Sequence, residues 1–119
     1  MVFNLDLESR ELLSQVGNGV LLGVVQISSR ILFVFRADHN ISADDRVFPG
    51  HRELLSANVI KANECWGFSF QLKEGKITRF YRNSMLNSQL PKFCISIEEM
   101  SDIIEALGVD TAEDFQYFP

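Results

Sequence analysis

The fold is decided by residues 65–82, which read CWGFSFQLKEGKITRFYR. In the first half of this stretch, large apolar side chains alternate with small or polar ones. This period of two places one face of a strand in a core and the other face towards water. Gly75 can adopt the positive φ that a tight turn requires. The stretch therefore predicts a hairpin of strands 66–72 and 77–82, whose buried face carries Trp66, Phe68, Phe70 and Leu72.

A second hairpin is predicted upstream of the first. Residues 20–27 read VLLGVVQI, a nearly continuous apolar run that is typical of a strand buried on both faces or central in its sheet. Gly23, in the middle of this run, indicates a bulge or a close approach of another group to the backbone. Three polar residues separate it from the apolar run 31–35, and so short a loop favours an antiparallel pair. A further short strand is predicted at 93–95.

Helices are predicted near both ends of the chain. Asp6 can cap a helix over residues 7–16. Ser96 and Glu99 have the spacing of a capping box, and the helix that they begin is predicted to end at Gly108. The apolar stripe of this second helix comprises Ile97, Met100, Ile103, Ile104 and Leu107.

The remaining segments are less regular. Residues 36–50 are polar, and Pro49 is predicted to begin a short helix that continues through Leu54 and Leu55. Thr111, with Asp114 three positions later, is predicted to cap a last turn that carries aromatic residues.

These elements predict one α+β domain over residues 1–119. It would contain an antiparallel sheet of four to five strands from two hairpins, packed against N- and C-terminal helices. A chain of 119 residues with a hydrophobic share of 46% can fill one core without disulfides or a structural metal.

The two cysteines, Cys65 and Cys94, are predicted to be free thiols. Each lies within an apolar stretch, where cysteine behaves as a small hydrophobic residue. The N-terminus has no secretory signal pattern, and the longest apolar run, 20–25, is too short to span a membrane. We therefore expect a cytoplasmic protein without a membrane partner.

Charge is distributed unevenly along the chain. Residues 19–96 carry ten Lys or Arg against six acidic residues, whereas residues 97–119 carry seven acidic residues and no basic one. One interpretation is a surface that recognises a basic protein partner by electrostatic complementarity. The other is the solvated side of a docked helix. The candidate partner-binding residues are Glu98, Asp102, Glu105, Asp110, Glu113 and Asp114.

A second candidate site centres on His51 and Glu53, which lie close in sequence to Asp44 and Asp45. These residues could perform acid–base chemistry. Residues two positions apart on a helix do not face each other, however, so the pair lacks the spacing of metal ligands. The same holds for a Cys₂His₂ zinc site built from His39, His51, Cys65 and Cys94, which are not arranged in close pairs. No metal or cofactor is predicted.

A third candidate site is the hairpin 73–82. Its cations are Lys73, Lys76, Arg79 and Arg82, with Phe80 and Tyr81 between the last two. Basic residues interleaved with aromatic ones can bind single-stranded nucleic acid. The same cations can simply protect a sheet edge from aggregation. The net charge of −5 argues against general affinity for nucleic acid. The chain also lacks a phosphate-binding loop, a dinucleotide fingerprint and a G-x-S-x-G elbow, which weighs against nucleotide-using and hydrolytic enzymes.

The residues and predicted elements from His51 to residue 110 follow one another in a recognisable order. His51 is followed by Leu54 and Leu55, a strand containing Gly67, the turn Glu74-Gly75-Lys76-Ile77, polar residues at 83–84 and the helix that Ser96 begins. This order resembles a small module of bacterial polymorphic-toxin and effector proteins. The module continues with Gly-His-Tyr where this chain has Met85-Leu86-Asn87.

The resemblance implies a bacterial protein from a toxin context, and it implies no site residues, because the module has no settled activity. Together with the small size and the acidity, it leads to the hypothesis of a non-enzymatic protein-binding domain. Such a domain would act as an immunity or antitoxin-like inhibitor of a basic toxin. The alternatives are an effector or enzyme that uses His51, and a nucleic-acid-binding domain that uses the hairpin 73–82.

Overall fold

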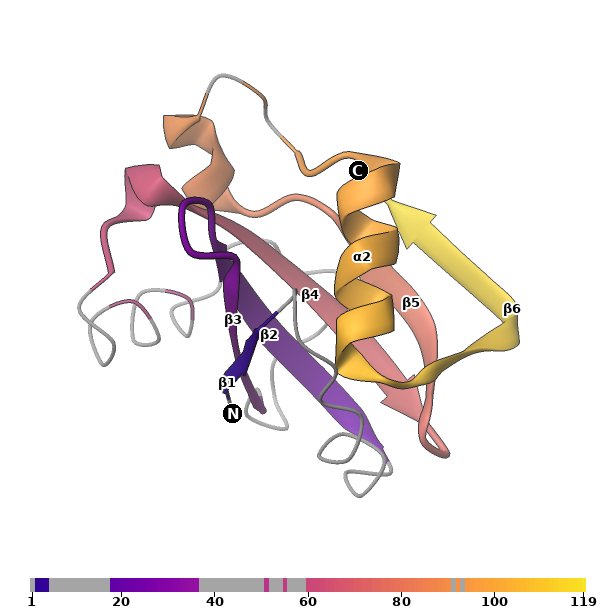
Figure 1. Ribbon diagram of the computed structural model, residues 1–119. Coiled ribbons are helices and arrows are strands. Elements are labelled where there is room, and N and C mark those ends of the chain that lie inside the picture. The colour runs from indigo at the N-terminus through magenta and orange to yellow at the C-terminus, as the bar shows by residue number, and fades with distance from the viewer. Residues whose placement is uncertain are drawn as a thin grey trace.

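The computed structural model describes residues 2–4, 18–36, 51, 55, 60–90, 92 and 94–119. These residues include one six-stranded sheet, the α-helix α2 and two short 3₁₀ helices (Figure 1). The strands are β1 (Val2–Asn4), β2 (Gly19–Gln26), β3 (Ile31–Arg36), β4 (Cys65–Lys73), β5 (Lys76–Tyr81) and β6 (Asp110–Phe118). The helices are η2 (Ala62–Glu64), η3 (Met85–Gln89) and α2 (Ile97–Leu107).

The strand order is β1-β3-β2-β4-β5-β6, and every neighbouring pair is antiparallel except β5 and β6. Both predicted hairpins are confirmed, as β2–β3 and as β4–β5. β2 lies between β3 and β4, and five consecutive residues at its centre are buried. This central position explains why its sequence is a nearly continuous apolar run.

The prediction of a purely antiparallel sheet is wrong, because β6 pairs in parallel with β5. α2 connects these two strands and lies across one face of the sheet (Figure 1). A helical crossover returns the chain to the starting end of β5, so the next strand enters the sheet parallel to it. The predicted last turn after Thr111 is therefore part of a strand. Gly108 makes the return possible with a left-handed φ of 70°.

β6 is an edge strand with an interrupted register. Thr111 pairs with Ile77, but the next pair along β5 is Arg79 with Gln116, so a four-residue segment of β6 bulges out between them. Most residues of β6 are exposed. A strand with this composition shows no apolar alternation, which is why the sequence did not predict it.

Two helical predictions fall largely outside the described residues. The helix over 7–16 lies wholly outside them, and of the short helix after Pro49 only His51 and Leu55 are described, both as helical. The short strand at 93–95 is not confirmed, since neither Cys94 nor Ile95 is in a strand. None of the described helices is long and apolar enough to cross a membrane.

The core lies on both faces of the sheet. On the face that α2 covers, the rings of Phe68, Phe70 and Phe80 stack with centroid distances of 5.2–6.1 Å and are fully buried. Met100, Ile103 and Leu107 of α2 belong to the same core. A smaller cluster contains Val24, Leu55 and Cys65. Phe68 and Val24 belong to paired strands and point to different clusters, so the centre of the sheet is buried on both sides. The prediction that the second face of β4 lies towards water is therefore wrong: Cys65, Gly67 and Ser69 are buried, and Trp66 is only partly buried.

The ends of α2 are where the sequence predicts them. The Ser96 hydroxyl accepts a hydrogen bond of 3.1 Å from the backbone N–H of Glu99, and Gly108 ends the helix. One member of the predicted apolar stripe differs, because Ile97 is 46% exposed. The buried residues of the helix are Met100, Ile103, Ala106 and Leu107.

Ile103→Val is expected to lower the free energy of unfolding by about 0.5–1.5 kcal/mol, because the lost methylene leaves a small cavity in the core. Ile97→Val on the same helix is the matched control and should change it by less than about 0.5 kcal/mol, since Ile97 is half-exposed. Urea denaturation measures both. Equal losses would mean that α2 packs with a different face towards the sheet.

Candidate functional site

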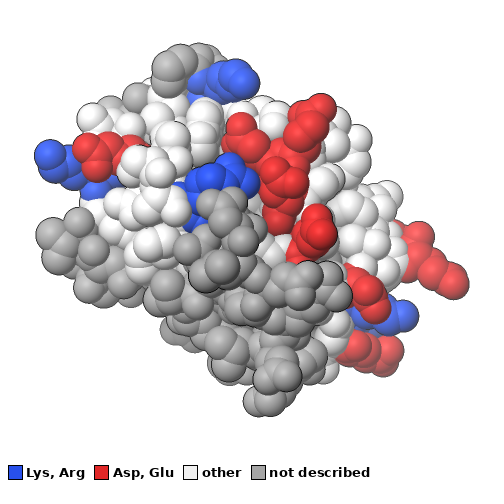
Figure 2. All heavy atoms as spheres, in the orientation of Figure 1, with Lys and Arg blue, Asp and Glu red and all other residues white. Residues whose placement is uncertain are grey.

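The exposed side of α2 is acidic. Glu98, Asp102 and Glu105 are exposed and follow the spacing i, i+4, i+7, which places them along one face of the helix. Figure 2 shows acidic side chains in a row over α2, with a basic group beside the row. Asp102 is 57% exposed. The structure therefore brings together three of the six sequence-predicted residues as one row.

The other three predicted residues lie on β6. Asp110 begins the strand, while Glu113 and Asp114 lie in its bulge, and all three are exposed. Asp110 is paired in register with Lys76 of β5. These carboxylates lie at the outer edge of the sheet, and they continue the negative charge of α2 onto the next element of the chain.

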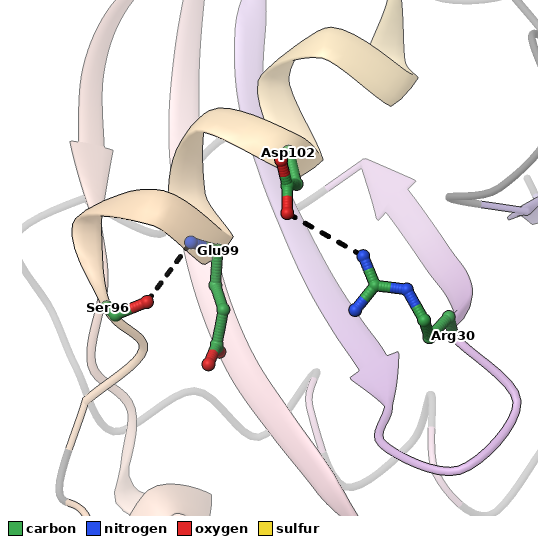
Figure 3. A network of polar contacts seen from close by, with 4 residues as sticks. All are labelled: Arg30, Ser96, Glu99 and Asp102. Carbon is green, nitrogen blue, oxygen red and sulfur yellow. Dashed lines mark hydrogen bonds and ion pairs between the residues drawn. The ribbon is translucent and has the colours of Figure 1, made fainter.

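Arg30 is the basic residue next to the acidic row. It closes the turn between β2 and β3, and its guanidinium Nη2 lies 3.7 Å from Oδ2 of Asp102 (Figure 3). Arg30 is 43% exposed, so solvent screens the ion pair and its contribution to stability is small. The sequence shows a hairpin turn at this position but not which helix the turn faces, so Arg30 was not predicted to contact α2.

A hollow of about 90 Å³ opens beside this ion pair, between the β2–β3 turn, the start of β4 and α2. Val25 and Ile103 are buried, whereas Trp66 is partly buried and Ile27 is 47% exposed. Ser29 donates a 2.6 Å hydrogen bond to the side chain of Gln26 and so holds one rim of the hollow. The lining residues are Val25, Gln26, Ile27, Arg30, Trp66, Glu99 and Ile103. Trp66 was predicted to lie in the core, and no pattern in the sequence indicates the hollow.

His51 is buried, with 2% of its surface exposed, and its Nε2 lies 2.9 Å from the backbone oxygen of Phe68. Burial lowers the pKa of His51, and hydrogen bonds with the backbone of Phe68 and Gly23 oppose this effect. The neutral imidazole is therefore favoured, and it contacts the backbone of the sheet. The acids predicted to act with it, Glu53, Asp44 and Asp45, lie outside the described residues.

Neither Cys65 nor Cys94 forms a disulfide bond, as predicted. Burial, with a smaller contribution from the Glu64 carboxylate, raises the pKa of Cys65 to about 11, so this thiol stays protonated at neutral pH. Cys94 lies 3.9 Å from Nη1 of Arg82. In the part of the chain that the structure describes, no group of His, Cys, Asp and Glu side chains could hold a metal ion. His39, the fourth member of the imagined zinc site, is not among the described residues.

The basic hairpin does not present its aromatic residues. Phe80 and Tyr81 are buried, and Tyr81 stacks on Phe118 with a centroid distance of 5.0 Å. Arg82 donates a 2.8 Å hydrogen bond to the backbone oxygen of Ile95, and its guanidinium lies 5.5 Å from the ring of Tyr117. Lys73, Lys76 and Arg79 remain exposed. Phe80 and Tyr81 therefore cannot stack on bases, which single-stranded nucleic-acid platforms require.

Comparison with protein-family models, with curated proteins and with solved structures finds no match to this chain. The candidate sites can therefore be ranked only by their own chemistry. His51 and the hairpin aromatics are buried, whereas the acidic row and the hollow beside it are open to solvent. The open sites are the ones that another molecule can reach.

Proposed function

We propose that this chain is a non-enzymatic protein-binding domain, and that its partner is a basic protein. The binding surface consists of Glu98, Asp102, Glu105, Asp110, Glu113 and Asp114, which we name the acidic surface. The observation that carries the proposal is that all six carboxylates are exposed on two consecutive elements, neither of which contains a basic residue. Charge of one sign on an exposed surface attracts a partner of opposite charge and accelerates its encounter.

The proposed partner is a toxin, and the proposed role is that of an immunity or antitoxin-like inhibitor in a bacterial cytoplasm. The resemblance of residues 51–110 to a module of polymorphic-toxin and effector proteins supports this role, as do the small size and the acidity. A small acidic domain can cover a basic surface of a toxin without performing chemistry itself. The burial of His51 against the sheet backbone favours this proposal over an enzyme that uses this histidine.

The proposal is tested by association kinetics with the partner, which affinity purification and mass spectrometry from the native host would identify. The variant Glu98→Gln with Glu105→Gln removes two charges from the acidic surface and keeps the ion pair of Asp102 intact. We expect it to associate severalfold more slowly at low salt and to dissociate at an unchanged rate, because exposed charges act mainly on encounter. The difference should disappear at high salt, where the Debye length is short.

The matched control is Glu64→Gln with Glu74→Gln. This pair removes the same charge from two exposed residues outside α2 and β6. It should leave association nearly unchanged. If both double variants slow association equally, the effect depends on net charge alone and the acidic surface is only a solvated face.

A further inference from the structure

We infer that the hollow beside Trp66 is an anchor site for an arginine side chain of the basic partner. The inference rests on the proposed function, and it adds a position, a residue type and a lining residue, Glu99, that the acidic surface does not include. The hollow lies next to the acidic row, because Arg30 both lines it and pairs with Asp102 of that row.

The size of the hollow selects the kind of occupant. Sites for small molecules and cofactors usually enclose about 300–1,000 Å³. The hollow offers about 90 Å³, which suits one side chain of a larger molecule rather than a free ligand. Protein interfaces commonly contain such anchors, in which an aromatic or arginine side chain enters a pocket near the centre of the contact.

The lining suits a side chain that is apolar along its length and cationic at its end. Val25 and Ile103 provide apolar surface in the hollow, and Ile27 extends it outward as an exposed side chain. The methylene stem of an arginine can pack on such surface while its head group stays at the rim. Trp66 adds an aromatic ring, the best partner for a cation–π contact with a guanidinium.

Glu99 provides the charge that an arginine head group needs. Its backbone N–H donates to Ser96, but among the described residues its carboxylate has no hydrogen bond or ion pair. The second half of the predicted capping box, from this carboxylate back to Ser96, is therefore absent. Figure 3 shows the Glu99 side chain extending away from Ser96 and from the Arg30–Asp102 pair.

Arg30 lines the hollow, but its positive charge does not make the hollow repel a cation. Its guanidinium is already engaged with Asp102, so the positive charge at the rim is matched by a carboxylate. The nearest remaining charges on α2 are Glu98 and Glu99, both negative. Among the described residues of α2, an incoming guanidinium therefore meets negative charge, whereas an incoming carboxylate would meet repulsion.

Trp66 makes the site directly observable, because it is the only tryptophan of the chain. The probes are three acetylated and amidated pentapeptides, Gly-Gly-X-Gly-Gly, in which X is arginine, its neutral isostere citrulline, or glutamate. Binding is followed by the fluorescence of Trp66 and by the NMR signal of its indole N–H. A single side chain without further contacts is expected to bind in the millimolar range.

The arginine peptide should shift the indole signal in a saturable way, and the citrulline and glutamate peptides should not. Glu99→Gln should weaken the arginine peptide about three- to fivefold, the effect of removing one partly exposed charge pair. Glu105→Gln is the matched control, because Glu105 is exposed on the same helix but does not line the hollow. This variant should bind as the wild type does. An unchanged indole signal in the free variants confirms that each is folded.

Three results would overturn the anchor site: no saturable shift with arginine, equal shifts with arginine and citrulline, or equal weakening in the two variants. The complex with the partner separates this inference from the proposed function. Loss of the anchor in Glu99→Gln should raise the dissociation rate, whereas loss of the acidic surface slows association. An unchanged dissociation rate in Glu99→Gln, with slowed association in the Glu98–Glu105 variant, would overturn the anchor and leave the proposed function standing.

Discussion

Asn87→Leu is expected to lower the free energy of unfolding by about 2–6 kcal/mol. The substitution leaves the buried backbone N–H and C=O of Gly67 without hydrogen-bond partners, and each such group costs roughly 1–3 kcal/mol. Asn87 is fully buried. Its Oδ1 accepts a 2.8 Å hydrogen bond from the N–H of Gly67, and its Nδ2 donates a 3.1 Å bond to the oxygen of the same residue. Leucine has a similar volume but can form neither bond. The loss would be a large part of the roughly 5–15 kcal/mol that usually stabilises a domain.

The reason for this arrangement is the length of β5. β5 pairs with β4 only as far as Ser69, so the backbone of Gly67 extends beyond the end of its neighbour. Asn87 takes the place of the missing strand residue, because its amide presents one donor and one acceptor as a peptide group does. Gly67 has no side chain, and a Cβ there would meet Ser84.

Urea denaturation of Asn87→Leu, with the exposed Asn63→Leu as control, measures the effect. The control should lie within about 0.5 kcal/mol of the wild type. A third variant, Asn87→Asp, keeps the acceptor but places an anion against the oxygen of Gly67. Burial raises the pKa of such a carboxyl, and only its protonated form can donate. The Asp variant should therefore gain stability relative to the Leu variant as the pH falls. Equal stability of Asn87→Leu and wild type would show that Gly67 needs no partner.

The parts of the fold that the sequence predicts are those decided by neighbouring residues. The strand from Trp66 to Leu72, the turn at Gly75 and the ends of α2 at Ser96 and Gly108 are local signals, and the structure confirms each of them. The water-facing side that the alternation predicted for this strand is wrong, because the opposite sheet face is covered by segments that the local pattern does not show. Gly23 was predicted to mark a bulge or a close approach of another group to the backbone. The structure shows a close approach, because the ring of Phe68 lies against Gly23.

The remaining features depend on contacts between distant segments. β6 contains Asp, Glu and Ala, which strands disfavour, and it forms a strand because α2 returns the chain beside β5. Ile97 follows the apolar period of α2 but is 46% exposed, and periodicity alone does not show which residues the rest of the chain covers. Asn87 was visible only as a departure from the resembled module, and its role depends on where β5 ends.

The candidate site also has a part that the sequence predicts and a part that depends on contacts between distant segments. The six carboxylates of the acidic surface were predicted from charge, and the structure places them all in solvent, whereas their role in binding stays a prediction. Glu99 was assigned to a capping box because its spacing from Ser96 fits one. That it lines a hollow instead depends on Arg30 and Trp66, from two other elements, so no local pattern could indicate it.

Gly23→Ala is expected to destabilise the fold by roughly 1–3 kcal/mol, the usual cost of overpacking a filled core. The three atoms nearest to a Cβ at Gly23 are all ring carbons of Phe68 and would overlap it. The ring cannot move aside easily, because Phe68 is fully buried and stacks on both Phe70 and Phe80.

A double-mutant cycle with Phe68→Leu tests this contact. Phe68→Leu alone should also destabilise, because it removes ring contacts in the core. The double variant should lose less than the sum of the two single losses, with a coupling of about 0.5–3 kcal/mol, because the shorter leucine side chain leaves room for the methyl group that Gly23→Ala adds. Gly75→Ala is the matched control: it has open space around it but a φ of +78°, so its cost arises from the backbone. Phe68→Leu should not rescue it. If the losses of Gly23→Ala and Phe68→Leu add to within about 0.5 kcal/mol, then the glycine is not required by the ring.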